Sequence, residues 1–120
     1  MGAAVQQSSP LVVYVDVDDT PIRTAGSKII PVSGVKEHVA ALASQGAAIY
    51  CWSSGGTEYA RNIAERLAIA HCFVGFLPKP HVILDDQPPE NWRRTTHILP
   101  GLCGAMTADA YWQEINAPRA

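Results

Sequence analysis

Apolar residues in this chain fall into short runs separated by polar turns. Residues 11–15 (LVVYV) and 47–52 (AAIYCW) are rich in branched and aromatic side chains and do not alternate with polar ones. This pattern is typical of strands buried on both faces of a parallel sheet. Similar runs predict strands at 72–76 (CFVGF) and 81–86 (HVILDD), and THIL at 96–99 predicts a short fifth strand.

Helical periodicity occupies the stretches between these strands. The first helix is expected at 33–44, with Ser33 as its N-cap and Gly46 just beyond its end. Its buried stripe recurs at i, i+4 and i+7: Val35, Val39 and Leu42. A second helix is expected at 57–67, and a third begins after Thr107 and reaches Ile115.

Strands that alternate with helices at short spacing indicate βαβ units, which require parallel strands and right-handed crossovers. We therefore predict an α/β fold, a three-layer Rossmann-like domain whose central parallel sheet is flanked by helices. One domain spans residues 11–120, after a polar leader at 1–10 that can be disordered. The proline- and glycine-containing segment 20–31 is expected to be a loop or a small hairpin flap, with Ile29 and Ile30 packing down.

Charge and cysteine content narrow the function classes. Nine basic residues against eleven acidic ones give a net charge of −2, and no basic run marks a dedicated nucleic-acid interface. The three cysteines, odd in number and without a CxxC pair, favour neither a disulfide framework nor a zinc site. With no apolar run long enough for a membrane helix, we expect no membrane association and a cytoplasmic location.

Polar side chains gather where the predicted strands end. Apolar runs are followed by Asp16, by Ser53 and by the pair Asp85 and Asp86. Lys79 lies just before the last of these runs, at 81–86. Carboxylates that meet at one sheet edge repel by about 4 kcal/mol per close pair at an effective dielectric constant of about 20. A cation must offset that repulsion, and Mg²⁺ suits a site of carboxylate and phosphate oxygens.

Such a site favours phosphoryl transfer. Lys79 and the metal would neutralise a phosphate, while Ser53, Ser54 and Gly55 offer hydroxyl and backbone N–H groups at a helix N-terminus. One carboxylate can attack phosphorus, and a second, two residues away, can transfer protons. Asp16 and Asp18 have that spacing.

These residues resemble the motifs of the haloacid dehalogenase (HAD) superfamily phosphatases. An apolar strand precedes DVDDT at 16–20, IYCWS ends at Ser53, FLPKP holds Lys79, and VILDD ends in the acidic pair. The four elements occur in the family's order and cover residues 11–89.

The resemblance implies a role for each matching position. Asp16 would be the nucleophile that forms an aspartyl-phosphate, and Asp18 the general acid/base, with its carbonyl on Mg²⁺. Thr20 would support the loop, Ser53 would bind the phosphoryl group, and Lys79 would hold nucleophile and phosphate together. The metal ligands would be Asp16, Asp18, Asp85 and Asp86, with Asp86 favoured over Asp85 for direct contact.

Three features depart from the usual family pattern. Asp19 stands where glycine is common, Pro21 stands where an apolar residue is frequent, and the segments between the motifs are too short for a cap domain. A capless member is expected to act on a phosphorylated small molecule or a macromolecular substrate, or to cover its site with a second subunit of a homo-oligomer. Trp52 or Trp92 would line such an opening, although core packing is the more common use of tryptophan.

Non-catalytic functions form the alternative class. A receiver-like signalling module shares the size, an acidic pair and Lys-Pro, but its elements follow a different order, because here the middle strand ends in Ser53 and the acidic pair follows Lys79. A HAD-like protein that binds phosphate or metal without turnover is the other alternative. A dehalogenase is a weaker alternative, because it would need no Mg²⁺ and Asp18 and the acidic pair would then have less purpose. The histidines show no ligand spacing and receive no role: His38, His71, His81 and His97.

Overall fold

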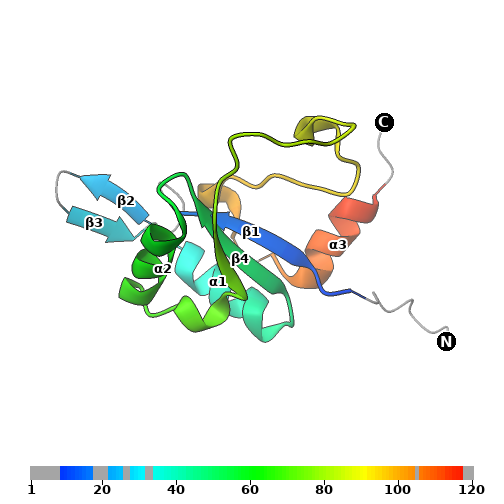
Figure 1. Ribbon diagram of the computed structural model, residues 1–120. Helices are drawn as coiled ribbons and strands as arrows, with labels where there is room; N and C mark the ends of the chain where they lie inside the picture. The colour runs from blue at the N-terminus through cyan, green and yellow to red at the C-terminus, as the bar shows by residue number, and fades with distance from the viewer. Residues whose placement is uncertain (1–8, 18–21, 26–27, 32–33, 105, 118–120) are drawn as a thin grey trace.

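A three-stranded parallel sheet organises the molecule (Figure 1). Its strands are β1 (Val12–Asp16), β4 (Ala48–Ser53) and β5 (Gly75–Pro78), and their spatial order is β1-β4-β5. In β1 and β4, Val15 pairs with Cys51 and Asp16 with Trp52. The computed structural model describes residues 9–17, 22–25, 28–31, 34–104 and 106–117, without the side chains of 22–25 and 28–31. Within these ranges the chain is a small α/β domain with a parallel sheet, as predicted.

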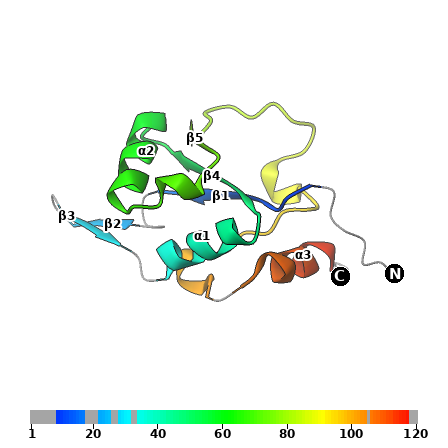
Figure 2. The ribbon, with the colours of Figure 1, turned by 90° about the horizontal axis from the view of Figure 1, so that it is seen from below.

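The two crossover helices cover one face of this sheet. The connections from β1 to β4 and from β4 to β5 step in the same direction, so right-handed crossovers place both helices on the same side. These helices are α1 (Val35–Ser44) and α2 (Thr57–Arg66), and both lie on the near side when the domain is viewed from below (Figure 2). The predicted stripe of α1 is confirmed, because Val35, Val39 and Leu42 are buried.

The core lies between that face and the helices. Val15, Ile49 and Cys51 from the strands pack in one cluster with apolar residues of α1 and α2. On the other face Val12 is 57% exposed and Tyr14 is 48% exposed. The prediction that the strand at 11–15 is buried on both faces is therefore wrong, because the helices cover only one of them.

A third helix, α3 (Ala108–Asn116), packs beside α1 rather than on the sheet's open face. Thr107 caps it, as predicted, by accepting a hydrogen bond from the Ala110 N–H. The side chains of His38 and Tyr111 join α1 to α3 through a buried hydrogen bond of 2.7 Å. His38 is thus a satisfied core residue, as expected for a histidine without ligand spacing.

The flap predicted at 20–31 contains an antiparallel hairpin, β2 (Ile22–Ala25) with β3 (Lys28–Pro31). Ile29 and Ile30 were expected to pack down, but their side chains are outside the part of the structure that is described. Ser33, expected as the cap of α1, lies outside the described residues; Gly34 occupies the N-cap position, with φ at 87°.

The chain after β5 departs from the predicted pattern. The strand predicted at 72–76 begins later, at Gly75, after the 3₁₀ turn η1 (Ala70–Cys72). The strands predicted at 81–86 and 96–99 are wrong: both segments lack strand structure, and Leu84 is fully exposed. An apolar run forms a strand only where a partner strand and a buried face are present.

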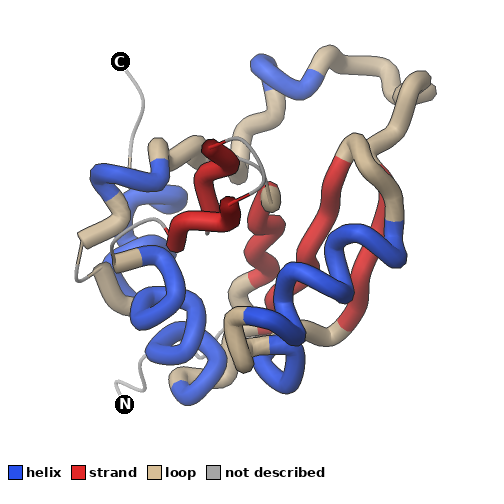
Figure 3. Tube along the Cα trace, turned by 90° about the vertical axis from the view of Figure 1, so that its left-hand side faces the viewer, coloured by secondary structure: helices blue, strands red, loops and turns tan. Residues whose placement is uncertain are grey.

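The long segment between β5 and α3 runs over the side of the sheet opposite to α1 and α2, and it rises well away from the strands (Figures 1 and 3). Two 3₁₀ turns interrupt it, η2 (Pro89–Asn91) and η3 (Pro100–Leu102). In the described part of the chain, no helix has the length and apolar character needed to cross a membrane.

Candidate active site

Asp16 and Lys79 meet at the carboxyl edge of the sheet. Asp16 is the last residue of β1, and Lys79 directly follows the last residue of β5. The Lys79 Nζ atom lies 3.0 Å from Oδ1 of Asp16, and each side chain is about one third exposed, at 35% and 34%. The ion pair is therefore open to a ligand from solvent.

Parallel strands explain this meeting, because they deliver their carboxyl ends to one edge. The Lys79 backbone N–H donates to the Ser53 carbonyl at 2.9 Å, which attaches the start of the exposed segment to the end of β4. The Lys79 ammonium also lies 5.7 Å from the centre of the Trp52 ring, within the range of a cation–π contact. Backbone and ring together hold Lys79 beside Asp16.

The turn SSGG between β4 and α2 is closely packed. Ser53 is 1% exposed, and its Oγ accepts a hydrogen bond of 2.9 Å from the Gly55 N–H. A Cβ atom on Gly55 would lie 2.9 Å from Cδ2 of Tyr59 and 3.3 Å from Ser53 Oγ, so the turn has no room for a side chain there. Gly56, with φ at 102°, adopts a backbone conformation that favours glycine.

These contacts divide the predicted phosphate-binding residues into two groups. Ser53 shapes the turn from beneath, on the helix-covered face, whereas Ser54 and Gly55 are exposed. A phosphate at this edge would therefore meet Ser54 and the N-terminal N–H groups of α2 more directly than the Ser53 hydroxyl.

Cys51 lies one position before Trp52, the β4 partner of Asp16. Burial, with a smaller contribution from the Asp16 carboxylate, raises the pKa of its thiol to about 12. Because the thiolate is the reactive form of cysteine, Cys51 is inert near neutral pH. It is a small residue of the core.

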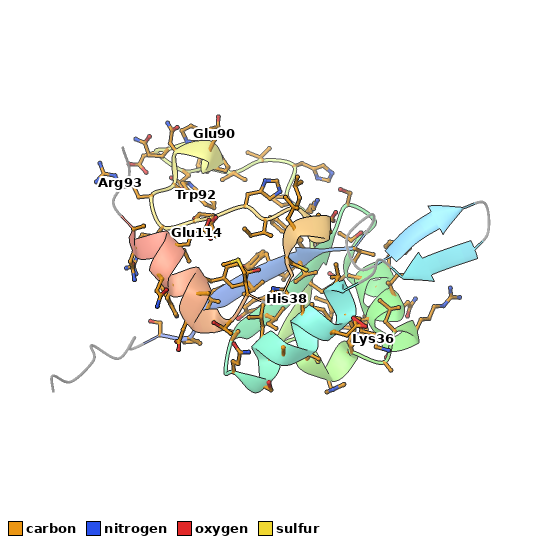
Figure 4. The ribbon with its side chains drawn as sticks, turned by 180° about the vertical axis from the view of Figure 1, so that it is seen from behind. Lys36, His38, Glu90, Trp92, Arg93 and Glu114 are labelled. Carbon is orange, nitrogen blue, oxygen red and sulfur yellow. The ribbon has the colours of Figure 1, made fainter. Side chains whose placement is uncertain are left out.

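The acidic pair lies in the exposed segment after β5. Asp85 accepts a hydrogen bond of 2.9 Å from the Gln87 N–H, and the Trp92 indole N–H donates to the Gln87 carbonyl at 3.3 Å. Asp85 and Asp86 help to line an open hollow of about 760 Å³, whose other lining residues come from the same segment: Gln87, Asn91, Trp92, Arg93, Arg94 and Thr95. Figure 4 shows Trp92, Arg93 and neighbouring Glu90 on this outer loop.

The structure thus brings together Asp16, Ser53 and Lys79, and the hollow that contains the acidic pair includes none of these three. Asp18 and Thr20 lie outside the described residues. Among the residues that are described, no group of three His, Cys, Asp or Glu side chains is arranged to hold a metal ion. The described carboxylates alone do not complete a Mg²⁺ site.

Tyr14 is a neighbour of the site that the sequence reasoning missed. Its ring centre lies 4.9 Å from that of Trp52, edge to face, and 5.3 Å from that of Tyr50. The available signal was the two-residue period of a strand, which places positions 14 and 16 on the same face. That signal was lost when the strand was interpreted as buried on both faces.

Comparison of the chain with protein-family models, with curated proteins and with solved structures finds no match.

Proposed function

We propose that this protein is a Mg²⁺-dependent phosphomonoester hydrolase of the HAD type, acting through an aspartyl-phosphate at Asp16. The contact between the Lys79 ammonium and the Asp16 carboxylate carries this proposal. The partly exposed Asp16 carboxylate can act as a nucleophile, but its negative charge repels an anionic substrate. Lys79 supplies the cation that offsets this repulsion.

The proposed reaction has two steps. In the first, an Asp16 oxygen attacks phosphorus, the bond from phosphorus to the ester oxygen breaks, and Asp18 gives that oxygen a proton. In the second, Asp18 takes a proton from a water molecule, which attacks the same phosphorus and releases inorganic phosphate and free Asp16. Lys79 would neutralise the phosphoryl oxygens throughout, and Ser54 with the N-terminal N–H groups of α2 would orient them.

Mg²⁺, when bound, would neutralise phosphoryl oxygens and reduce their repulsion from Asp16. Its proposed ligands are the Asp16 carboxylate, the Asp18 carbonyl, and Asp86 or Asp85. This requires the acidic pair to come close to Asp16. Within the described chain β1 pairs only with β4, which leaves its other edge for a further strand.

The exposed run Val82–Ile83–Leu84 is apolar, and burying it would remove large hydrophobic side chains from water. It cannot add to the free edge of β1 as a parallel strand, because only three residues separate it from the end of β5 at the opposite edge of the sheet. We propose instead that the segment after β5 moves toward the carboxyl edge in the metal-bound enzyme and brings Asp85 and Asp86 beside Asp16.

Hydrolysis of an aryl phosphate with and without Mg²⁺ tests the proposal. Wild type is expected to release phosphate only with the metal, Asp16→Asn is expected to be inactive, and the exposed Asp109→Asn on α3 serves as a matched control with wild-type rates. Activity in Asp16→Asn, or activity that ignores chelation, would reject the mechanism. Binding of phosphate and Mg²⁺ without any turnover would instead favour the non-catalytic binding module.

A further inference from the structure

The open face of the sheet carries three aromatic side chains next to the Asp16–Lys79 pair. We call Tyr14, Tyr50 and Trp52 the aromatic row. Tyr14 pairs with Tyr50, and Asp16 pairs with Trp52, so all four side chains belong to the same face. Neither α1 nor α2 covers this face, the segment after β5 rises away from the strands on this side (Figures 1 and 3), and Tyr14 is 48% exposed. An aromatic surface is thus continuous with the nucleophile.

Trp52 connects the aromatic row to the Asp16–Lys79 pair. Its ring centre lies 4.9 Å from that of Tyr14, with the ring planes at 90°, and 5.7 Å from the Lys79 ammonium. The same ammonium lies 3.0 Å from Asp16. A phosphoryl group bound by Asp16 and Lys79 would therefore lie next to the aromatic row.

We propose that the aromatic row binds the leaving group of the substrate and that the enzyme acts on aryl phosphates, whose ring is bonded directly to the ester oxygen. This inference rests on the proposed function. A ring so attached lies only a few ångströms from phosphorus, which matches the short separation between Lys79 and Trp52.

Energetics favour this occupant over an alkyl ester. Contacts between aromatic rings contribute about 0.5–1.5 kcal/mol beyond the burial of their area, and the exposed part of Tyr14 adds apolar surface that an alkyl group covers less well. A phosphotyrosine side chain and a small aryl phosphate share this chemistry. Competition by free phosphotyrosine and by a phosphotyrosyl peptide distinguishes these two sources.

A simpler function for Trp52 is to hold Lys79 in place. In that case the affinity for every phosphorylated ligand would depend equally on Trp52. Binding of two non-hydrolysable probes, phenylphosphonate and methylphosphonate, separates the two explanations. With Mg²⁺ present, phenylphosphonate is expected to bind about tenfold more tightly, and its titration is expected to shift the NMR signals of Tyr14 and Trp52. Equal affinities, or no binding of either probe, would overturn the proposal.

Variants sharpen the test. Tyr14→Leu is expected to bring the affinity ratio close to one, Tyr14→Phe to keep it, and Trp112→Leu, which removes a partly exposed aromatic ring from α3, to leave it unchanged. Circular dichroism would verify that each variant folds; should Tyr14→Leu not fold, the ring-specific NMR shifts of wild type decide. A ratio that survives in folded Tyr14→Leu would overturn the proposal.

Failure of this inference differs from failure of the proposed function. Preferential binding of phenylphosphonate without hydrolysis of phenyl phosphate would retain the aromatic site and reject the hydrolase. Hydrolysis of phenyl phosphate and glycerol phosphate with equal kcat/KM would retain the hydrolase and reject the aromatic site.

Discussion

The Lys79 ammonium lies 3.0 Å from the Asp16 carboxylate, although Asp16 ends one edge strand, β1, and Lys79 follows the other, β5. Lys79 crosses above β4 to reach Asp16, and it passes over the Trp52 ring on the way. The pair therefore depends on the parallel arrangement of all three strands, and it places a fixed cation beside the proposed nucleophile.

Removing the Lys79 charge tests that arrangement. Lys79→Gln is expected to lower kcat/KM for an aryl phosphate by about 10²–10³-fold, because an electrostatic contact to the phosphoryl group is lost. Lys36→Gln, which removes an exposed lysine on α1 (Figure 4), is the matched control and is expected to leave kcat/KM unchanged. Equal effects of the two substitutions would show that Lys79 has no special role.

The two serines of the SSGG turn are expected to differ. Ser53→Ala removes the acceptor of the Gly55 N–H and is expected to lower the free energy of unfolding by about 1 kcal/mol. Ser54→Ala, at an exposed position, is expected to leave stability unchanged and to raise KM. Urea unfolding and steady-state kinetics measure both quantities; a stability loss in Ser54→Ala alone would contradict the assignment.

Close packing at Gly55 makes a further prediction. Gly55→Ala would force the new methyl group against the Tyr59 ring, and we expect a loss of about 1–3 kcal/mol in the free energy of unfolding. Gly101→Ala is the matched control, because nothing lies within 4 Å of its added Cβ. Urea unfolding of the two variants should therefore give clearly different midpoints, and similar midpoints would argue against the packing of this turn.

Buried His38 predicts a dependence of stability on pH. Burial lowers the pKa of His38 below the ordinary value of 6.5. Well above pH 6.5 the imidazole is neutral in both the folded and the unfolded chain, so it contributes no pH dependence there. As the pH falls below that value, the unfolded chain takes up the proton more readily, and the free energy of unfolding decreases until the folded pKa is passed.

Thermal unfolding between pH 7.5 and 5 measures this effect. His38→Gln is expected to flatten the profile in this range, at some cost in stability, because the hydrogen bond to Tyr111 changes. His97→Gln, at an exposed position, should keep the wild-type slope. A wild-type slope in His38→Gln would assign the acid sensitivity to other groups.

The sequence was sufficient to predict the elements whose burial comes from local pattern. Apolar runs placed the strands that became β1 and β4, the i, i+4, i+7 stripe placed α1, and Thr107 placed the start of α3. The sequence also grouped Asp16 with Lys79, but it placed Lys79 ahead of a strand at 81–86, whereas in the structure Lys79 follows the end of β5.

Other features depend on tertiary context that the local pattern does not contain. Residues 82–84 have high strand propensity, but a strand also requires a neighbour, and in this structure the run stays exposed. The exposure of Tyr14 depends on the direction in which successive crossovers step, which no property of the LVVYV run reveals. The acidic pair was expected beside Asp16 at the end of a strand at 81–86. Because that strand does not form, the pair lies in the outer hollow.

The covalent state of Asp16 during turnover tests the central claim most directly. Wild-type protein mixed with an aryl phosphate and Mg²⁺ would be quenched in acid, digested and analysed by mass spectrometry. The account predicts a phosphoryl group on the peptide that contains Asp16, and none in Asp16→Asn. Rapid hydrolysis of the ester by wild type with no phosphorylated Asp16 at any quench time would contradict it.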